Sequence, residues 1–154
     1  MEANTAGDAT TNGASANEAL FREIIAAFGR ADVEGIAERF TEDCIYREMH
    51  RPGHRVEGRE AFRASLREYF SNFDMTDSQI TFVAVIANDT HVCGEFETTA
   101  RYVGPGSSAE GDTVTWNATI LDSVDGGKVK EEHVYVDARA SSVEGRRGAP
   151  HSRG

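Results

Sequence analysis

The sequence predicts a single α+β domain, in which helices come first and an antiparallel sheet follows. The length of 154 residues suits one domain. Apolar residues recur at helical spacing up to about residue 73, whereas from Ser78 onward they alternate with polar residues as in half-buried strands. The segments 1–16 and 141–154 show neither period, so we expect disordered tails on either side of a folded domain at 17–140.

Three helices are expected in the first half of the chain. The first begins after Asn17 as its N-cap and ends near Gly29, the second begins after Asp32, and the third runs from Arg59 to about Phe73. Each has an apolar stripe of the kind that faces a core. The three stripes are Leu20, Phe21, Ile24, Ile25 and Phe28; Val33, Ile36, Ala37 and Phe40; and Phe62, Leu66, Tyr69, Phe70 and Phe73.

A lone strand and a four-stranded meander account for the remaining periodic segments. The lone strand, 44–49, precedes a Pro52–Gly53 turn, and the meander strands are expected near 78–87, 91–103, 113–124 and 128–137. Turn residues at 88–89 and 125–127 indicate hairpins, and 104–112 is a longer connection. A curved sheet of this kind, closed over by helices, leaves a pocket.

Composition excludes several function classes. The net charge of −10 argues against a nucleic-acid partner, because the phosphates would be repelled. The chain has no apolar run near the roughly 18 residues of a membrane span, and residues 1–16 do not have the pattern of a secretory signal. We therefore expect a cytoplasmic protein with no membrane partner. Cys44 and Cys93 are far apart, which favours two reduced thiols.

Neither a metal nor a cofactor is predicted. His50 and His54 are four residues apart, but the Pro52–Gly53 turn separates them and no third ligand has suitable spacing. The chain contains no phosphate-binding loop, nucleotide fingerprint or G-x-S-x-G motif.

The first candidate for chemistry is Glu48. It lies two residues after Tyr46, so the two side chains share a face of the first strand. In an apolar cavity a carboxylate has its charged form disfavoured, which moves it toward the range useful for proton transfer. The alternative is a strand-end carboxylate that pairs with an arginine such as Arg51.

The last strand offers two faces. One carries Glu132, Val134 and Val136, and the other carries Glu131, His133, Tyr135 and Asp137. Period 2 alone does not show which face lines the cavity, because a slip of one residue exchanges them. Either Glu132 or the His133, Tyr135 and Asp137 set could transfer protons there.

Three stretches resemble the ketosteroid-isomerase and SnoaL-like families of the nuclear-transport-factor-2-like superfamily. They are IIAAFGRADVEGIAERFTEDCIYREM at 24–49, EGREAF at 57–62 and GGKVKEEHVYVD at 126–137. The resemblance implies a cone-shaped fold in which three N-terminal helices pack on a curved antiparallel sheet and enclose a pocket. It places Glu48 where the isomerase has its proton-shuttling base. It also turns the Glu132 face toward the cavity, as a second acid or base opposite Glu48.

The same resemblance argues against two specific activities. The isomerase's oxyanion hole needs a Tyr in the first helix and an Asp in the penultimate strand, and those positions correspond to Ile24 and Ile120. The last-strand Asp of limonene epoxide hydrolase corresponds to about Val134. In SnoaL-like cyclases a His and an Asp act from the closing strands, and only Asp137 offers a counterpart here.

The resulting hypothesis is a cofactor-independent cyclase or isomerase that acts by proton transfer on a small apolar natural-product intermediate, with Glu48 and Glu132 as the catalytic pair. The alternatives are a non-catalytic small-molecule-binding or dimerisation module, and an epoxide hydrolase. For Trp116 the alternative role is core packing, and for Asp122 it is backbone hydrogen bonding. The residues expected to bind substrate are Tyr46, His50, Tyr69, Phe96, Trp116 and Asp122.

A homodimer is also expected. It would form through the outer face of the sheet, as is common in the superfamily, leaving the cavity accessible from the 50–56 loop. The outer face carries Thr99, Arg101, Asn117, Thr119 and Leu121.

Overall fold

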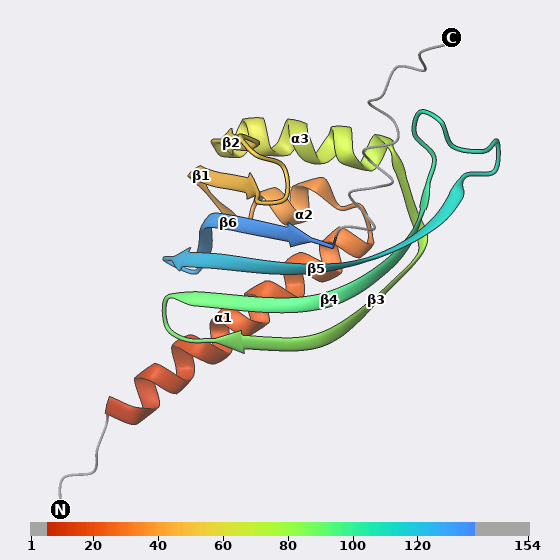
Figure 1. Ribbon diagram of the computed structural model, residues 1–154. Coiled ribbons are helices and arrows are strands. Elements are labelled where there is room, and N and C mark those ends of the chain that lie inside the picture. Colours follow the sequence, from red (N-terminus) through yellow and green to blue (C-terminus); the bar gives the residue numbers. More distant parts are fainter. Residues whose placement is uncertain (1–5, 138–154) are drawn as a thin grey trace, which may run out of the picture.

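The computed structural model describes residues 6–137, with side chains described from residue 12 onward (Figure 1). The described chain forms three helices and one six-stranded sheet, which confirms the α+β class. The helices are α1 (Ala6–Gly29), α2 (Val33–Ala37) and α3 (Arg59–Ser71). The strands are β1 (Phe40–Glu48), β2 (Arg55–Glu57), β3 (Phe73–Ala87), β4 (His91–Tyr102), β5 (Asp112–Asp125) and β6 (Lys128–Val136).

The sheet has the order β2-β1-β6-β5-β4-β3. Strands β3 to β6 form the expected antiparallel meander. The strand expected at 44–49 corresponds to β1, and it does not stand apart from the sheet. It pairs in parallel with β6, where Glu48 lies opposite Val134. The short strand β2, which the sequence pattern does not predict, pairs with β1 after the chain folds back through the Pro52–Gly53 turn.

The curvature of the sheet creates the concave surface on which the helices pack (Figure 1). Helix α1 packs against β3 and β4, whereas α3 packs against β1, β2 and the beginning of β3. Phe21 of α1 fills the place where a side chain at position 94 would stand, so Gly94 permits close packing of the helix on β4. The space beside Gly94 is therefore occupied.

Helix α1 begins earlier than the sequence indicates. It starts at Ala6, and Asn17 lies buried within it rather than at its N-cap. The Asn17 amide donates instead to the carbonyl oxygen of Asn88 at 2.7 Å, which ties the helix to the β3–β4 turn. Intrinsic propensity does not account for the extension, because weak helix formers such as Gly, Thr, Asn and Asp outnumber alanine in residues 6–16. Of the tails expected at 1–16 and 141–154, residues 1–5 and 141–154 lie outside the described residues, whereas 6–16 belong to α1.

Two other boundaries differ because pairing in the sheet overrides local pattern. Helical spacing predicts Phe40 in the second helix, but it begins β1 and is fully buried. The same spacing predicts Phe73 in the third helix, but it begins β3, opposite Tyr102 of β4. Within the described range, no helix is both long and apolar enough to cross a bilayer.

Candidate functional site

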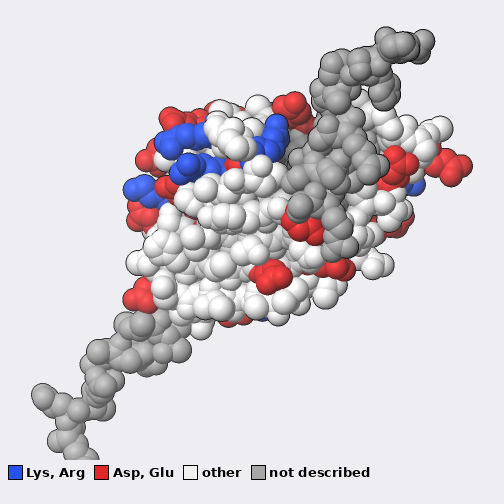
Figure 2. All heavy atoms as spheres, in the orientation of Figure 1, with Lys and Arg blue, Asp and Glu red and all other residues white. Residues whose placement is uncertain are grey.

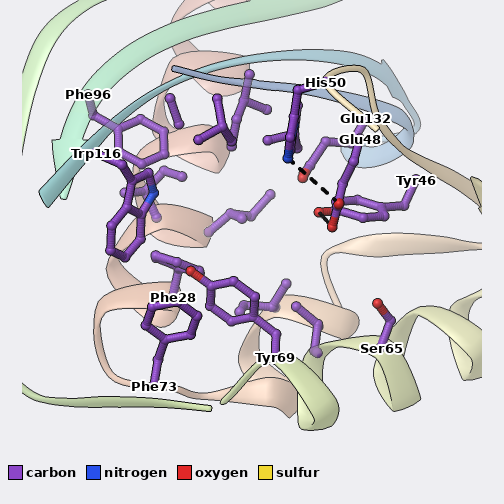
Figure 3. Close-up of a pocket in the computed structure, with 18 of the residues that line it drawn as sticks. Phe28, Tyr46, Glu48, His50, Ser65, Tyr69, Phe73, Phe96, Trp116 and Glu132 are labelled. Atoms are coloured by element: carbon purple, nitrogen blue, oxygen red, sulfur yellow. Dashed lines mark hydrogen bonds and ion pairs between the residues drawn. The ribbon is translucent and has the colours of Figure 1, made fainter. Parts of the chain in front are cut away.

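A cavity of about 340 Å³ lies between the concave face of the sheet and helices α1 and α3. Its two ends differ in chemistry (Figure 3). Aromatic side chains surround one end, and carboxyl, phenol and imidazole groups gather at the other. The aromatic residues are Phe28, Tyr69, Phe73, Phe96 and Trp116, and the polar ones are Tyr46, Glu48, His50 and Glu132.

The structure brings together all but one of the site residues expected from the sequence. Both proposed catalytic carboxyls line the cavity. Of the residues expected to bind substrate, Tyr46, His50, Tyr69, Phe96 and Trp116 also line it. Asp122, which was also expected to bind substrate, is fully buried and is not among the residues that line the cavity.

The two faces of β6 have different surroundings. Glu132 is only 6% exposed and lines the cavity together with Val134. On the opposite face His133 pairs with Glu131, with Nε2 and Oε1 2.6 Å apart. The alternative arrangement, in which His133, Tyr135 and Asp137 face the cavity, is therefore wrong.

Glu48 lies at the polar end of the cavity, held on two sides. The Tyr46 hydroxyl donates to Oε1 at 3.1 Å, and Nη1 of Arg51 donates to Oε2 at 2.9 Å. Nε2 of His50 and Nδ1 of His54 each lie 3.9 Å from Oε2. Glu48 thus lines the cavity and pairs with Arg51 at the same time, and the guanidinium stabilises its ionised form.

The surroundings of Glu48 are unusually basic for an acidic chain. Figure 2 shows Lys and Arg side chains gathered over β1, β2 and α3. Arg51, Arg55 and Arg59 lie in this part of the chain, and each is paired with a glutamate. Arg55 and Arg59 are thus paired elsewhere, and of these three arginines only Arg51 binds Glu48.

Tyr46 positions the carboxylate beside it. Burial and then the negative charge of Glu48 raise the pKa of the Tyr46 hydroxyl well above its usual value, so it is a neutral hydrogen-bond donor at pH 7. Its ring packs on Phe62, with centroids 5.2 Å apart, and meets His54 edge-on at 6.1 Å. These contacts fix the direction in which the hydroxyl points.

Glu132 is the protonated counterpart of Glu48. Burial raises the pKa of Glu132 to about 8, so its neutral acid form predominates at pH 7. Asp122 lies opposite it on β5, and burial followed by the charge of Glu132 raises the pKa of Asp122 well above its usual value. Asp122 is fully buried opposite Glu132 and is not among the residues that line the cavity.

Several cavity residues are not singled out by the sequence. Ser65 lies one helical turn before Tyr69, so i,i+4 spacing would have placed it on the same face of α3. Thr113 and Thr115 line the cavity from the first part of β5, which follows the connection at 104–112. Within residues 6–137, no three His, Cys, Asp or Glu side chains converge as a metal ion would require. The absence of a cofactor stays a prediction.

The comparisons with known proteins agree with this geometry. The profile of the SnoaL-like domain family matches residues 21–132. Among curated protein sequences, none is significantly similar to the chain.

Solved structures share the fold at low sequence identity. A protein from Jannaschia sp. CCS1, assigned as a SnoaL-like polyketide cyclase, is 19% identical over 89% of this chain and 94% of its own, with a TM-score of 0.72. AclR from Streptomyces galilaeus, assigned as a hydroxylase, is 22% identical over 87% and 97%, with a TM-score of 0.68. An LEH-like epoxide hydrolase from M. tuberculosis is 15% identical over 82% and 86%, with a TM-score of 0.65. Because the family profile matches residues 21–132, from α1 to β6, this chain belongs to the SnoaL-like domain family.

Proposed function

We propose that this protein is a cofactor-independent enzyme that catalyses ring closure or isomerisation of a small, largely apolar molecule by proton transfer. The observation that carries the proposal is a pair of carboxyl groups in one cavity whose surroundings favour opposite protonation states. Glu48 accepts hydrogen bonds from Arg51 and Tyr46, whereas burial raises the pKa of Glu132 to about 8. Such a pair can supply a base and an acid at the same pH.

The chemistry follows from these two roles. Glu48 accepts a proton from a C–H or O–H group of the substrate, and Glu132 donates its proton to the oxygen on which negative charge develops. In an aldol-type closure, the enolate carbon bonds to a second carbonyl carbon, whose oxygen takes the proton. In an epoxide-opening cyclisation, a hydroxyl oxygen bonds to the epoxide carbon as its C–O bond breaks, and the released oxygen takes the proton.

Other features of the cavity support this choice over its alternatives. Ile24 and Ile120 line the cavity, so neither position supplies the donor of a ketosteroid isomerase. Val134 is aliphatic where the epoxide hydrolase has its aspartate, which disfavours that mechanism. A purely structural module needs no open cavity of this size, and the apolar walls suit a natural-product substrate. The shared fold with proteins assigned as polyketide cyclases supports the same substrate class.

Proton exchange in a carbon acid tests the proposal without the natural substrate. 1-Tetralone, an apolar two-ring ketone, is incubated with the protein in D2O, and deuterium uptake beside its carbonyl is followed by NMR. We expect uptake faster than in buffer, because Glu48 removes that proton. Val136→Phe should narrow the cavity and slow the exchange. Ketone binding with exchange no faster than in buffer would contradict the proposal.

We also propose that two copies of the chain associate through the outer face of the sheet. Besides the polar residues expected there, this face exposes Val83, Ile86 and Tyr135, whose side chains are apolar or aromatic. Light scattering should give twice the chain mass of 16.8 kDa. Ile86→Glu should shift the mass to that of one chain. A single-chain mass for the unmodified protein at micromolar concentration would exclude the dimer.

A further inference from the structure

Asp122 is a buried acid for which the cavity itself offers no role. Its exposed fraction is 0%, and it is not among the residues that line the cavity. Within the described residues, no N–H or hydroxyl group donates to either of its carboxyl oxygens. A carboxyl group buried in this way is costly when ionised, which calls for a compensating partner.

That partner is Glu132. The two residues lie opposite each other on β5 and β6, and their buried carboxyl groups interact, so a proton on one of them can bridge to the other. A hydrogen bond between two carboxyl groups requires a proton on at least one of them. Burial raises the pKa of Asp122 well above its usual value, so once Glu132 has given up its proton, Asp122 is the member of the pair that can donate.

The other titratable groups near the two carboxyls do not replace Glu132 as the partner of Asp122. The Cys44 thiol and the Tyr46 hydroxyl lie near Glu132 on β1. On β4, Val92 lies opposite Asp122, and the Cys93 thiol lies on the other face of the sheet. Burial raises the pKa of all three, so none of them carries a charge at pH 7. Helix α1 covers this part of the sheet with apolar side chains such as Phe21. Among the described residues, Glu132 is also the only titratable group that shifts the pKa of Asp122.

We propose that Asp122 is a positioning residue, which holds Glu132 toward the cavity and donates a hydrogen bond to the carboxylate that Glu132 becomes after giving up its proton. This inference rests on the proposed role of Glu132 as the acid. It assigns a role in the reaction to a residue that the substrate does not touch.

The proton balance of a cycle is simple. Glu48 gains one proton from the substrate and Glu132 loses one to it, while Asp122 keeps its own proton throughout. After product release, water at the partly exposed Glu48 removes the first proton, and the Glu132 carboxylate regains one from water in the emptied cavity. The hydrogen bond from Asp122 makes Glu132 a stronger acid at the moment of transfer.

The test compares Asp122→Leu with Asp122→Asn, because leucine cannot donate a hydrogen bond and the asparagine amide can. The side-chain carboxyl carbon of 13C-labelled glutamate reports the titration of Glu132 by NMR, without any turnover. Asp122→Leu should move this titration upward by about one to two pH units, since a hydrogen bond to a charged group is lost. Asp122→Asn should leave it within about half a unit of the unmodified protein.

The exchange of 1-tetralone gives the second readout. The exchange rate should fall at high pH, where Glu132 loses its proton. In Asp122→Leu the pH of this fall should move upward together with the Glu132 titration, and the maximal exchange rate should drop about tenfold or more. Asp122→Asn should restore both. The matched control is Thr98→Val, which removes a fully buried hydroxyl without a hydrogen-bond partner and should not move the titration.

The titration results test the positioning role of Asp122, and the exchange results test the proposed function. If the Glu132 titration stays in place in Asp122→Leu, or moves equally in the leucine and asparagine variants, the positioning role is overturned. If Asp122→Leu does not fold, an upward displacement in Asp122→Ala decides the same point. A protein with the expected titrations but no exchange activity would overturn the proposed function and leave the hydrogen-bonded pair established.

Discussion

Replacing Glu48 with Gln is expected to slow the proton exchange of 1-tetralone by about 10²–10⁴-fold while ligand binding changes little. Glutamine retains the shape of the side chain and one oxygen to accept from the Tyr46 hydroxyl, but it cannot take up a proton. Rates are measured by NMR at saturating ketone, and binding is measured separately by ligand line broadening.

The matched control for this substitution is Glu57→Gln. Glu57 lies on β2, with its side chain 68% exposed, and pairs with Arg55. Its replacement removes the same charge close to Glu48 without touching the cavity, so exchange should be unchanged. Equal activity in Glu48→Gln and the unmodified protein would mean that the cavity works by shape alone. Lost binding with normal turnover would make Glu48 a residue for substrate positioning.

The double variant with Glu48→Gln and Glu132→Gln examines whether the two groups act together. Glu132→Gln alone should also slow a reaction that needs its proton by about 10²–10⁴-fold. If acid and base serve one transition state, the double variant should lose much less than the product of the two single losses.

Glu132→Gln should also change how the stability of the fold depends on pH. The pKa of Glu132 is raised to about 8 by burial, above the roughly 4.3 of an unfolded glutamate. The stability that this group contributes is therefore fully present below about pH 4 and is lost as the pH rises toward 8. The loss amounts to about 1.4 kcal/mol for each pH unit in that window, and glutamine abolishes it.

Chemical denaturation at about pH 5, 7 and 9 measures this effect. The free energy of unfolding of Glu132→Gln should rise relative to that of the unmodified protein by several kcal/mol between the lowest and highest pH. Asp122 remains buried in the variant, so some pH dependence persists. Glu97→Gln, on the exposed face of β4, should show no such gain. Parallel pH curves for Glu132→Gln and the unmodified protein would show that Glu132 is ionised throughout.

Local periodicity was sufficient for the helices, the hairpins and the lining of the cavity. The apolar stripe of α3 and the alternation along β4, β5 and β6 depend on residues a few positions apart. They can therefore be recognised in the sequence. Periodicity gives the faces of Tyr69, Phe96 and Trp116 on their own elements, whereas their assignment to one pocket came from the family resemblance; all three line the cavity.

Contacts between distant segments were decided only by the tertiary structure. Period 2 leaves the two faces of β6 equivalent, whereas in the folded chain Glu132 lies on the concave face, covered by the helices, and His133 lies on the other face. The parallel pairing of β1 with β6 and the bond from Asn17 to Asn88 join residues far apart in the chain. The pairing of Asp122 with Glu132 likewise depends on strand register and on the exclusion of water, neither of which local pattern encodes.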